Sequence, residues 1–216
     1  MKMGEEFEKV KTGTTCIGLL CKDGVILAAD RRTTAGFIAS DNSTKVYELA
    51  PNIVATTAGH AADNQRVMRG MKGELKLQRL RNERPSYVVE AAMLLNSTQY
   101  AMLRQMGSIV SIILGGYDSS KGAQLFNLSP DGTILHHDGY VVDGSGSVYV
   151  KGVLDTMYKK DMSIKEALEL VEKGFLASFK NDNMSGGGYI ARIITVDGSE
   201  EIARKSIEGK FVDVKE

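Results

Sequence analysis

The chain has 216 residues, which is long enough for one domain with a substantial hydrophobic core. Lysine plus arginine and aspartate plus glutamate number 27 each, so the formal net charge is zero and no general attraction to nucleic acid or to an anionic membrane is expected. The sequence has no apolar run of the roughly 18 residues that a membrane helix needs, and its acidic first residues do not form a secretory signal. Cys16 and Cys21 lie on opposite faces of one predicted strand and cannot readily pair, which favours a reduced, cytoplasmic protein.

The first half of the chain changes from strand patterns to helix patterns. Alternating apolar residues around Asp23-Gly24 predict a hairpin over about residues 14–32, followed by a turn and a short strand at 33–40. A second hairpin is expected from strands at 45–49 and 53–59. Helical periodicity then predicts helices over 61–81 and 85–106, and their short connection favours antiparallel packing.

The second half repeats this order. Strands are expected at 109–118, 124–128 and 133–135, and a helix at 148–160. A second helix begins at the capping box of Ser163 and Glu166 and extends to about residue 181. A final strand is expected at 189–196, with a short charged helix near 200–205. Because the strands are almost wholly apolar, helices must cover the outer face of each sheet, so we expect a single domain with an α+β fold, a four-layer αββα sandwich.

The residues alone leave the chemistry open at several positions. Thr14 opens the first strand, where a β-branched residue is ordinary. Asp30 closes an apolar run, so its carboxylate is expected to be partly buried and to need a partner, for which Arg32 is a nearby candidate. His136 and His137 would point to opposite faces of a strand, which disfavours a metal site.

Several linked motifs occur in order over residues 13–196. They are Gly13-Thr14-Thr15, GVILAADRR at 24–32, Lys45-Val46, Ala58-Gly59, Ala62-Asp63, Gly115-Gly116, GSGS at 144–147, GVLD at 152–155, and Asp182 with Ser185-Gly186-Gly187. Together they resemble the motifs of archaeal-type 20S proteasome β subunits, which belong to the N-terminal nucleophile hydrolase superfamily. One such motif is weak evidence, but their common order along the chain is strong evidence. The resemblance implies the αββα fold of that superfamily.

The resemblance also implies a domain division and a reaction. Residues 1–13 are expected to be a propeptide, removed by autocatalytic cleavage between Gly13 and Thr14, and residues 14–216 a single catalytic domain. The implied enzyme is a threonine endopeptidase that cleaves unfolded polypeptides. This arrangement is chemically sensible, because a free α-amine with a pKa of about 7.7–8.0 is a suitable general base for the poorly nucleophilic Thr14 hydroxyl. Gly13 has no Cβ, so its carbonyl can approach that hydroxyl closely.

The family's functional positions can be carried over to this chain. Lys45 is expected to favour the deprotonated Thr14 hydroxyl, Asp30 to keep that lysine charged, and the Gly59 N–H to donate to the oxyanion. Thr33, Tyr47 and Thr57 are expected near the pocket for the side chain before the cut. Because they are uncharged, they predict a preference for apolar or neutral side chains at that position. The catalytic positions are Thr14, Asp30, Lys45, Ser145, Asp182 and Ser185, of which the last three surround the amine. The peptide-binding positions are Thr33, Thr34, Tyr47, Thr57, Gly59 and Ala61.

The implied partners are proteasome α subunits and other β subunits, in stacked seven-membered rings, and a regulatory ATPase that acts through the α rings. No cofactor, metal, nucleic acid or membrane is expected. The main alternative is a non-catalytic or unprocessed structural β subunit of the same ring; an α subunit and a small-molecule amidase are further alternatives. Cys16, where threonine is common, and His60, where small or apolar residues are common, depart from the family pattern and bear on substrate preference.

Overall fold

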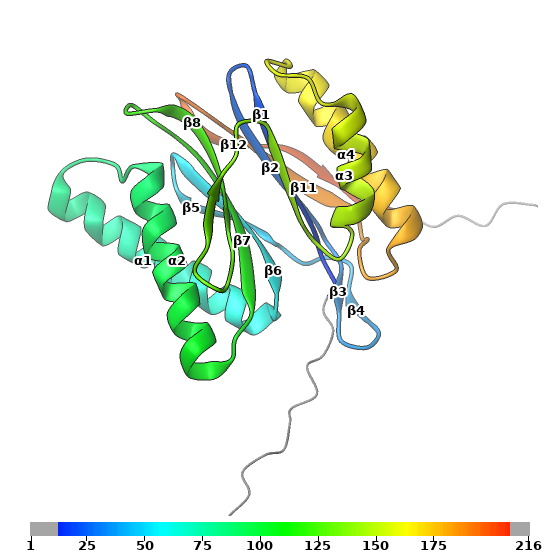
Figure 1. Cartoon of the computed structure of the whole chain (residues 1–216), viewed down its shortest axis with the longest axis horizontal. Helices are drawn as coiled ribbons and strands as arrows, with labels where there is room; N and C mark the ends of the chain where they lie inside the picture. The colour runs from blue at the N-terminus through cyan, green and yellow to red at the C-terminus, as the bar shows by residue number, and fades with distance from the viewer. Residues whose placement is uncertain (1–12, 208–216) are drawn as a thin grey trace, which may run out of the picture.

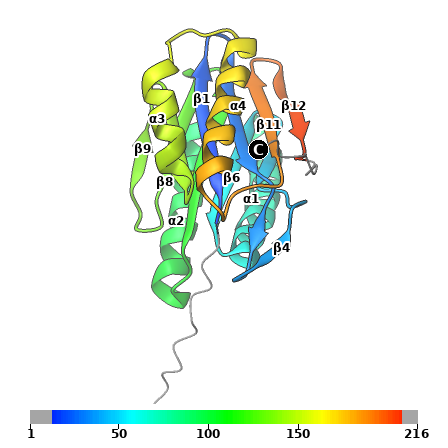
Figure 2. The ribbon, with the colours of Figure 1, turned by 90° about the vertical axis from the view of Figure 1, so that its right-hand side faces the viewer.

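The computed structural model describes residues 13–207, and these residues form four layers (Figure 1). One helix pair covers one sheet, a second sheet packs against the first, and a second helix pair covers the far side. The view in Figure 2 shows the two helices of the second pair lying along their sheet. The predicted α+β sandwich is therefore confirmed. The helices are α1 (Ala61–Asn82), α2 (Val88–Met106), α3 (Ser147–Met157) and α4 (Ile164–Asn181).

Two five-stranded sheets, in which all neighbouring strands are antiparallel, form the middle layers. The first has the order β10-β1-β2-β11-β12 and the second has the order β5-β6-β7-β8-β9. The first sheet consists of β1 (Thr15–Cys21), β2 (Gly24–Asp30), β10 (Tyr140–Gly144), β11 (Tyr189–Thr195) and β12 (Gly198–Lys205). The second consists of β5 (Val46–Ala50), β6 (Ile53–Gly59), β7 (Val110–Asp118), β8 (Gly122–Leu128) and β9 (Ile134–His136). A separate short pair is formed by β3 (Thr33–Thr34) and β4 (Ile38–Ser40).

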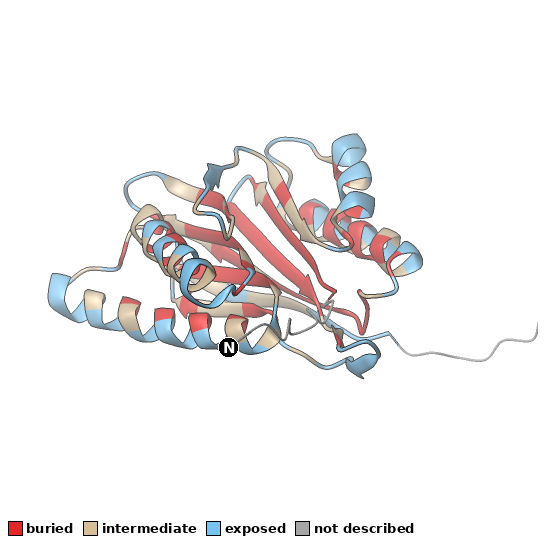
Figure 3. Ribbon diagram, turned by 60° about the horizontal axis from the view of Figure 1, so that its bottom comes forward, coloured by how far each residue is buried: buried red, intermediate tan, exposed pale blue. Residues whose placement is uncertain are grey.

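The side chains of β2 show why the sheets need cover on both faces. Val25 and Leu27 pack between the sheets, whereas Ile26 and Ala28 face α3 and α4, because successive side chains of a strand point to opposite faces. Figure 3 shows the resulting concentration of buried residues in the strands and on the inner sides of the helices. The strand's unbroken apolar sequence thus follows from its position between two cores.

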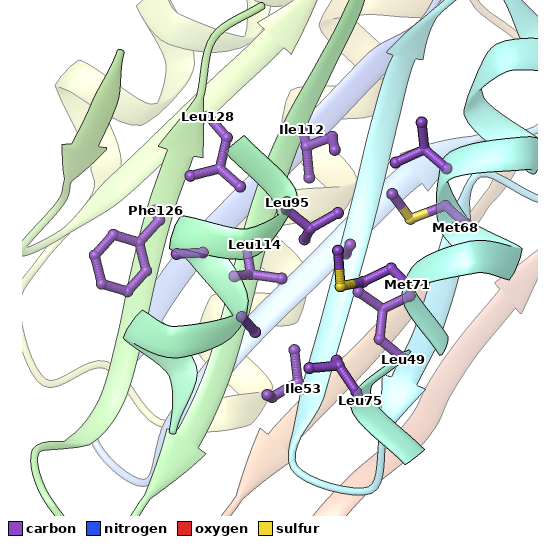
Figure 4. Close-up of a cluster of buried hydrophobic side chains, with 14 of the residues drawn as sticks. Leu49, Ile53, Met68, Met71, Leu75, Leu95, Ile112, Leu114, Phe126 and Leu128 are labelled. Carbon is purple, nitrogen blue, oxygen red and sulfur yellow. The ribbon is translucent and has the colours of Figure 1, made fainter. Parts of the chain in front are cut away.

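A separate core holds α1 and α2 against the second sheet. Met68, Met71 and Leu75 of α1 and Leu95 of α2 are almost completely buried there (Figure 4). At roughly 1.5–3 kcal/mol for each large apolar side chain removed from water, this packing stabilises the position of α1 strongly. It therefore fixes the first turn of α1, which borders the cleft described below. Within the described residues, no helix combines the length and apolar character needed to cross a membrane.

Two elements differ from the sequence-based expectation. The segment expected to be helical near 200–205 is strand β12, which pairs with β11 in an antiparallel hairpin from Thr195↔Gly198 to Tyr189↔Lys205. Gly198 has φ +113°, which suits the turn, and the charged side chains of β12 suit an exposed sheet edge. Strand β10 was not expected at all, yet it pairs with β1. In addition, α2 begins at Val88 rather than 85 and α3 ends at Met157 rather than 160.

Several element ends meet at one end of the sandwich. The register places Thr15 opposite Gly144 of β10, and Cys16 opposite Ala29 of β2. Asp30, the last residue of β2, lies opposite Tyr189 at the start of β11. The beginning of β1 is therefore surrounded by the end of β2, the end of β10 and the loop that connects α4 to β11.

Candidate active site

The Gly13–Thr14 junction is enclosed by protein on both sides. The Gly13 N–H donates to Thr34 Oγ1 at 3.0 Å, and the Thr14 hydroxyl donates to the Gly13 carbonyl at 2.6 Å. A Cβ added at Gly13 would lie 1.9 Å from Met184 Cβ and 2.7 Å from the Met184 carbonyl oxygen. Only glycine fits this position without movement of the 182–186 loop.

Lys45 connects the Thr14 hydroxyl to Asp30. Its Nζ lies 3.1 Å from Thr14 Oγ1, 3.2 Å from the Gly13 carbonyl oxygen and 2.7 Å from Asp30 Oδ1. Thr14, Asp30 and Lys45 are all buried. An ammonium group in this position favours negative charge on the Thr14 oxygen, because a buried ion pair is poorly screened by water.

Asp30 is held by three backbone N–H donors in addition to its charge partner Lys45. Its Oδ1 accepts from the Thr15 N–H and from Lys45, and its Oδ2 accepts from the backbone N–H groups of Arg32 and Gly186. Burial raises the pKa of Asp30, while Lys45 and the backbone donors act in the opposite direction. The salt bridge to the Arg32 side chain does not form, because that guanidinium pairs with Asp41 instead. The partner of the buried carboxylate is therefore Lys45.

A second group of polar residues surrounds the Thr14 nitrogen. The Thr14 N–H donates to Ser145 Oγ at 3.2 Å, and Ser145 Oγ in turn donates to Asp182 Oδ2 at 2.6 Å. Ser185 Oγ donates to the same carboxylate oxygen at 2.6 Å. Ser145 comes from the turn after β10, whereas Asp182 and Ser185 follow α4. The residues expected around the amine are thus gathered there, although the sequence separates them widely.

A cleft of about 470 Å³ opens beside Thr14. Gly59 borders it with φ +114°, and a Cβ added there would lie 2.3 Å from the Ile109 carbonyl oxygen, so glycine is needed at this turn. All six positions expected to bind peptide line the cleft, namely Thr33, Thr34, Tyr47, Thr57, Gly59 and Ala61. Asp30, Ser145, Asp182 and Ser185 do not line it but lie behind Thr14, within the hydrogen-bond network.

Some residues that line the cleft were not predicted from the sequence. Asn64, Gln65 and Arg69 of α1 reach the cleft, as do the loop residues 42–44. Asn64 Nδ2 also donates to the Gly59 carbonyl at 3.3 Å, which ties the first turn of α1 to the end of β6. The spacing of Ala61, Gln65 and Arg69, four residues apart on one helix face, was the available signal. It needed the additional knowledge that this face points toward Thr14.

The two departures from the family pattern lie beside the site. Cys16 is buried between the sheets with 1 % of its surface exposed, and burial raises the pKa of its thiol far above the ordinary value. A thiol that stays protonated is a poor nucleophile. The His60 side chain is largely exposed, with Nδ1 3.4 Å from the Asp63 carboxylate.

Comparisons with known proteins point to one family. The family model described as proteasome subunit matches residues 10–194. A proteasome subunit beta of Ferroglobus placidus is 37% identical over 93% of this chain and 95% of its own length. Similar proteins of the same description from Methanocella paludicola (36% identical over 95% of this chain and 98% of the relative) and Methanocaldococcus jannaschii (35%, over 94% and 91%) align over almost their whole lengths. The chain therefore belongs to the proteasome subunit family and is of the archaeal β-subunit type.

Proposed function

We propose that this chain is a threonine endopeptidase subunit of a proteasome core, with Thr14 as its nucleophile. The observation that carries the proposal is the environment of Thr14 Oγ1, which lies 3.1 Å from the buried Lys45 ammonium and 2.6 Å from the carbonyl oxygen of the peptide bond to be cut. The hydrogen bond places the hydroxyl beside the carbonyl group that it is to attack, and the adjacent cation favours the deprotonated oxygen that acts as the nucleophile.

The first reaction is removal of residues 1–13. Thr14 Oγ1 attacks the Gly13 carbonyl carbon, the bond from that carbon to the Thr14 nitrogen breaks, and the nitrogen takes up the proton. The resulting ester joins Gly13 to the Thr14 oxygen until water hydrolyses it. The products are the propeptide, which ends in a Gly13 carboxylate, and a domain of residues 14–216 with a free α-amine at Thr14.

The second reaction is hydrolysis of a bound peptide. The Thr14 α-amine accepts the hydroxyl proton as the oxygen attacks the substrate carbonyl, and the amine later returns this proton to the leaving nitrogen. Lys45, with Asp30 as its counter-charge, stabilises the developing alkoxide. The Gly59 N–H donates to the oxyanion, a kind of contact whose removal typically costs about 2.7–4 kcal/mol. Ser145, Asp182 and Ser185 hold the amine in place.

Substrate and partners follow from the same assignment. We infer that the chain assembles with proteasome α subunits and other β subunits, and that a regulatory ATPase delivers unfolded polypeptides through the α rings. An extended peptide lies along the cleft beside Thr33, Thr34, Gly59 and Ala61 and adds main-chain hydrogen bonds as an extra strand does. Uncharged Thr33, Tyr47 and Thr57 favour apolar or neutral side chains before the cut. Strong selectivity for acidic residues there would contradict this assignment.

The decisive experiment is intact-mass measurement with N-terminal sequencing after co-expression with the matching α subunit. The unsubstituted chain is expected to lose residues 1–13 and to expose Thr14. The Thr14→Ala variant is expected to keep them and to hydrolyse no peptide. Cys16→Ala is the matched control, because it removes the other nucleophilic side chain on this strand, and it is expected to be processed and active.

Three results would overturn the proposal. An unsubstituted chain that keeps residues 1–13 inside fully assembled particles would be a structural subunit. Peptide hydrolysis by the Thr14→Ala variant would mean that another residue is the nucleophile. The same conclusion would follow if the Cys16→Ala variant assembled normally but hydrolysed no peptide.

A further inference from the structure

Two buried hydroxyl groups extend the network around Asp182 beyond the residues already assigned. Thr15 Oγ1 lies 2.7 Å from Ser185 Oγ and 2.7 Å from Ser178 Oγ. Thr15 and Ser178 have no exposed surface and Ser185 is 1 % exposed. A continuous series of hydrogen bonds therefore runs from Ser178, in the last turn of α4, through β1 to the Asp182 carboxylate.

The direction of each hydrogen bond in this series follows from proton counting. The Asp182 carboxylate has no proton to donate when ionised, so Ser185 must use its single hydroxyl proton on Asp182 Oδ2 at 2.6 Å. The Ser185 oxygen can then only accept from Thr15. Because Thr15 donates its single hydroxyl proton to Ser185, its oxygen must accept from Ser178. The order of donation is Ser178 to Thr15 to Ser185 to Asp182.

The protein packs closely around these hydroxyls and leaves no room for another hydrogen-bond partner. A Cβ added at Gly146 would lie 2.1 Å from both Ser178 Oγ and Thr15 Oγ1, so the turn that carries Ser145 packs directly on this pair of hydroxyls. A hydroxyl lost here leaves a buried donor or acceptor without a partner, because the neighbouring space is filled by the protein.

We propose that Thr15 and Ser178 are positioning residues for the Thr14 amine, acting through Ser185 and Asp182. This inference rests on the proposed function of Thr14. Hydrogen bonds in a chain polarise one another, so donation from Ser178 and Thr15 strengthens the bond from Ser185 to Asp182. Asp182, fixed in this way, holds the Ser145 hydroxyl at 2.6 Å and leaves the Ser145 oxygen to accept from the Thr14 nitrogen.

The test uses full-length variants co-expressed with the matching α subunit, with activity divided by the amount of chain that begins at Thr14. Thr15→Val keeps the side chain's shape and removes its hydroxyl; kcat is expected to fall about tenfold with KM unchanged, as expected for loss of one buried hydrogen bond to a polarised network. Thr15→Ser restores the hydroxyl and should recover most of the activity. Thr98→Val is the matched control, because Thr98 Oγ1 donates only to the Leu94 carbonyl of its own helix.

A double-mutant cycle separates positioning from simple packing. Ser185→Ala removes the link between Thr15 and Asp182, so Thr15→Val is expected to cost less than about twofold in kcat on the Ser185→Ala background. Ser178→Ala should follow the same pattern with a smaller effect, because it lies one hydroxyl further from Asp182.

Equal losses from Thr15→Val on both backgrounds would overturn the inference, as would unchanged kcat in Thr15→Val or failure of Thr15→Ser to recover it. These outcomes leave the assignment of Thr14 intact, because that assignment depends on Thr14→Ala. If instead Thr14→Ala retains activity, the proposed function fails first, and the cycle reports only on packing.

Discussion

At the residue scale, Gly13 shows how closely the scissile bond is enclosed. In a Gly13→Ala variant, the new Cβ would overlap Met184, and the junction would have to move. A displacement of about 1 Å from reactive geometry can cost 10²-fold in rate, so we expect removal of residues 1–13 to slow by about that factor. Intact mass of the chain, followed over time after assembly, measures the rate.

Gly70→Ala is the control for this prediction. Gly70 lies inside α1 and a Cβ there would have no atom within 4 Å, so processing should proceed at the unsubstituted rate. If Gly13→Ala is processed as fast as Gly70→Ala, the tight enclosure of the junction does not control the cut.

The buried ion pair of Asp30 and Lys45 gives a second prediction at the residue scale. Asp30→Asn keeps the side chain's shape but leaves the buried Lys45 ammonium without its counter-charge. Breaking a buried ion pair in this way typically costs about 3–5 kcal/mol, and we expect a loss of this order in the free energy of unfolding together with slower processing. Denaturant titration of the isolated full chain measures the first quantity, and intact mass after assembly measures the second.

The Asp41→Asn variant provides the comparison, since Asp41 pairs with Arg32 and its side chain is 49% exposed. An exposed pair is worth about 0–1 kcal/mol, so this variant should be nearly neutral. Equal destabilisation by the two substitutions would mean that burial of the Asp30–Lys45 pair has no special importance.

The residues of the site were predictable only to the extent that a family pattern marked them. From the sequence alone, Asp30 needed a partner, but the choice between nearby Arg32 and distant Lys45 depended on a contact between two sheets. Thr15 and Ser178 gave no signal, because a hydroxyl on a strand or at the end of a helix is ordinary. Their importance arises only when the packing of α4 on β1 brings them within 2.7 Å.

At the element scale, Asp118 ties the start of α2 to the end of β7. Its Oδ2 accepts from the Val88 N–H at 2.7 Å and from Gln124 at 2.8 Å, and Ser120 donates to its Oδ1. Burial alone would raise the pKa of Asp118, but the hydrogen bonds from Ser120, Val88 and Gln124 outweigh it and lower the pKa below the ordinary value.

The stability that Asp118 provides should therefore depend on pH. The pKa is lower in the folded state than the value of about 3.9 in the unfolded chain, so the stabilisation is present above pH 4 and is lost as the pH falls through the folded-state pKa. Asp118→Asn is expected to cost about 1–3 kcal/mol at pH 7, because its amide cannot accept at both positions. Denaturant unfolding of both proteins at pH 7 and pH 3 should show the difference shrinking; a constant difference would contradict the ionic role.

Long periodic elements were predicted well, and so were β5 and β9 at the edges of the second sheet, but β10 and β12 at the edges of the first sheet were not. The capping box of Ser163 and Glu166 identified the start of α4 correctly, because its signal is local. Strand β12 was taken for a helix because its charged side chains suit either an exposed helix or a sheet edge. What decides the matter is the unpaired backbone edge of β11, which β12 satisfies, and no local pattern reports that edge.

At the scale of the whole molecule, the order of elements was sufficient to predict the four layers. It did not predict what contacts the outward surfaces of the helices. Val148 of α3 and Leu176 of α4 are 76% and 62% exposed. Val150 packs against Gly174, so the start of α3 lies beside the end of α4. These exposed apolar residues thus lie on the segments that lead from Ser145 and toward Asp182. We expect these two exposed apolar side chains to lie at a contact with a neighbouring subunit.

Such a contact would connect assembly to activity. A neighbouring subunit that covers Val148 and Leu176 would brace the two segments that hold the Thr14 nitrogen. We therefore expect the double variant Val148→Asp/Leu176→Asp to fold, because both side chains are exposed, but to assemble poorly with the matching α subunit and to retain residues 1–13. Native mass spectrometry measures assembly, and intact mass measures processing.

Val196→Asp is the matched control. Val196 is 72% exposed in the turn between β11 and β12, and this variant should assemble normally. Particles of the double variant that form in normal yield and are fully processed would show that this helical surface is not an interface on which the active site depends.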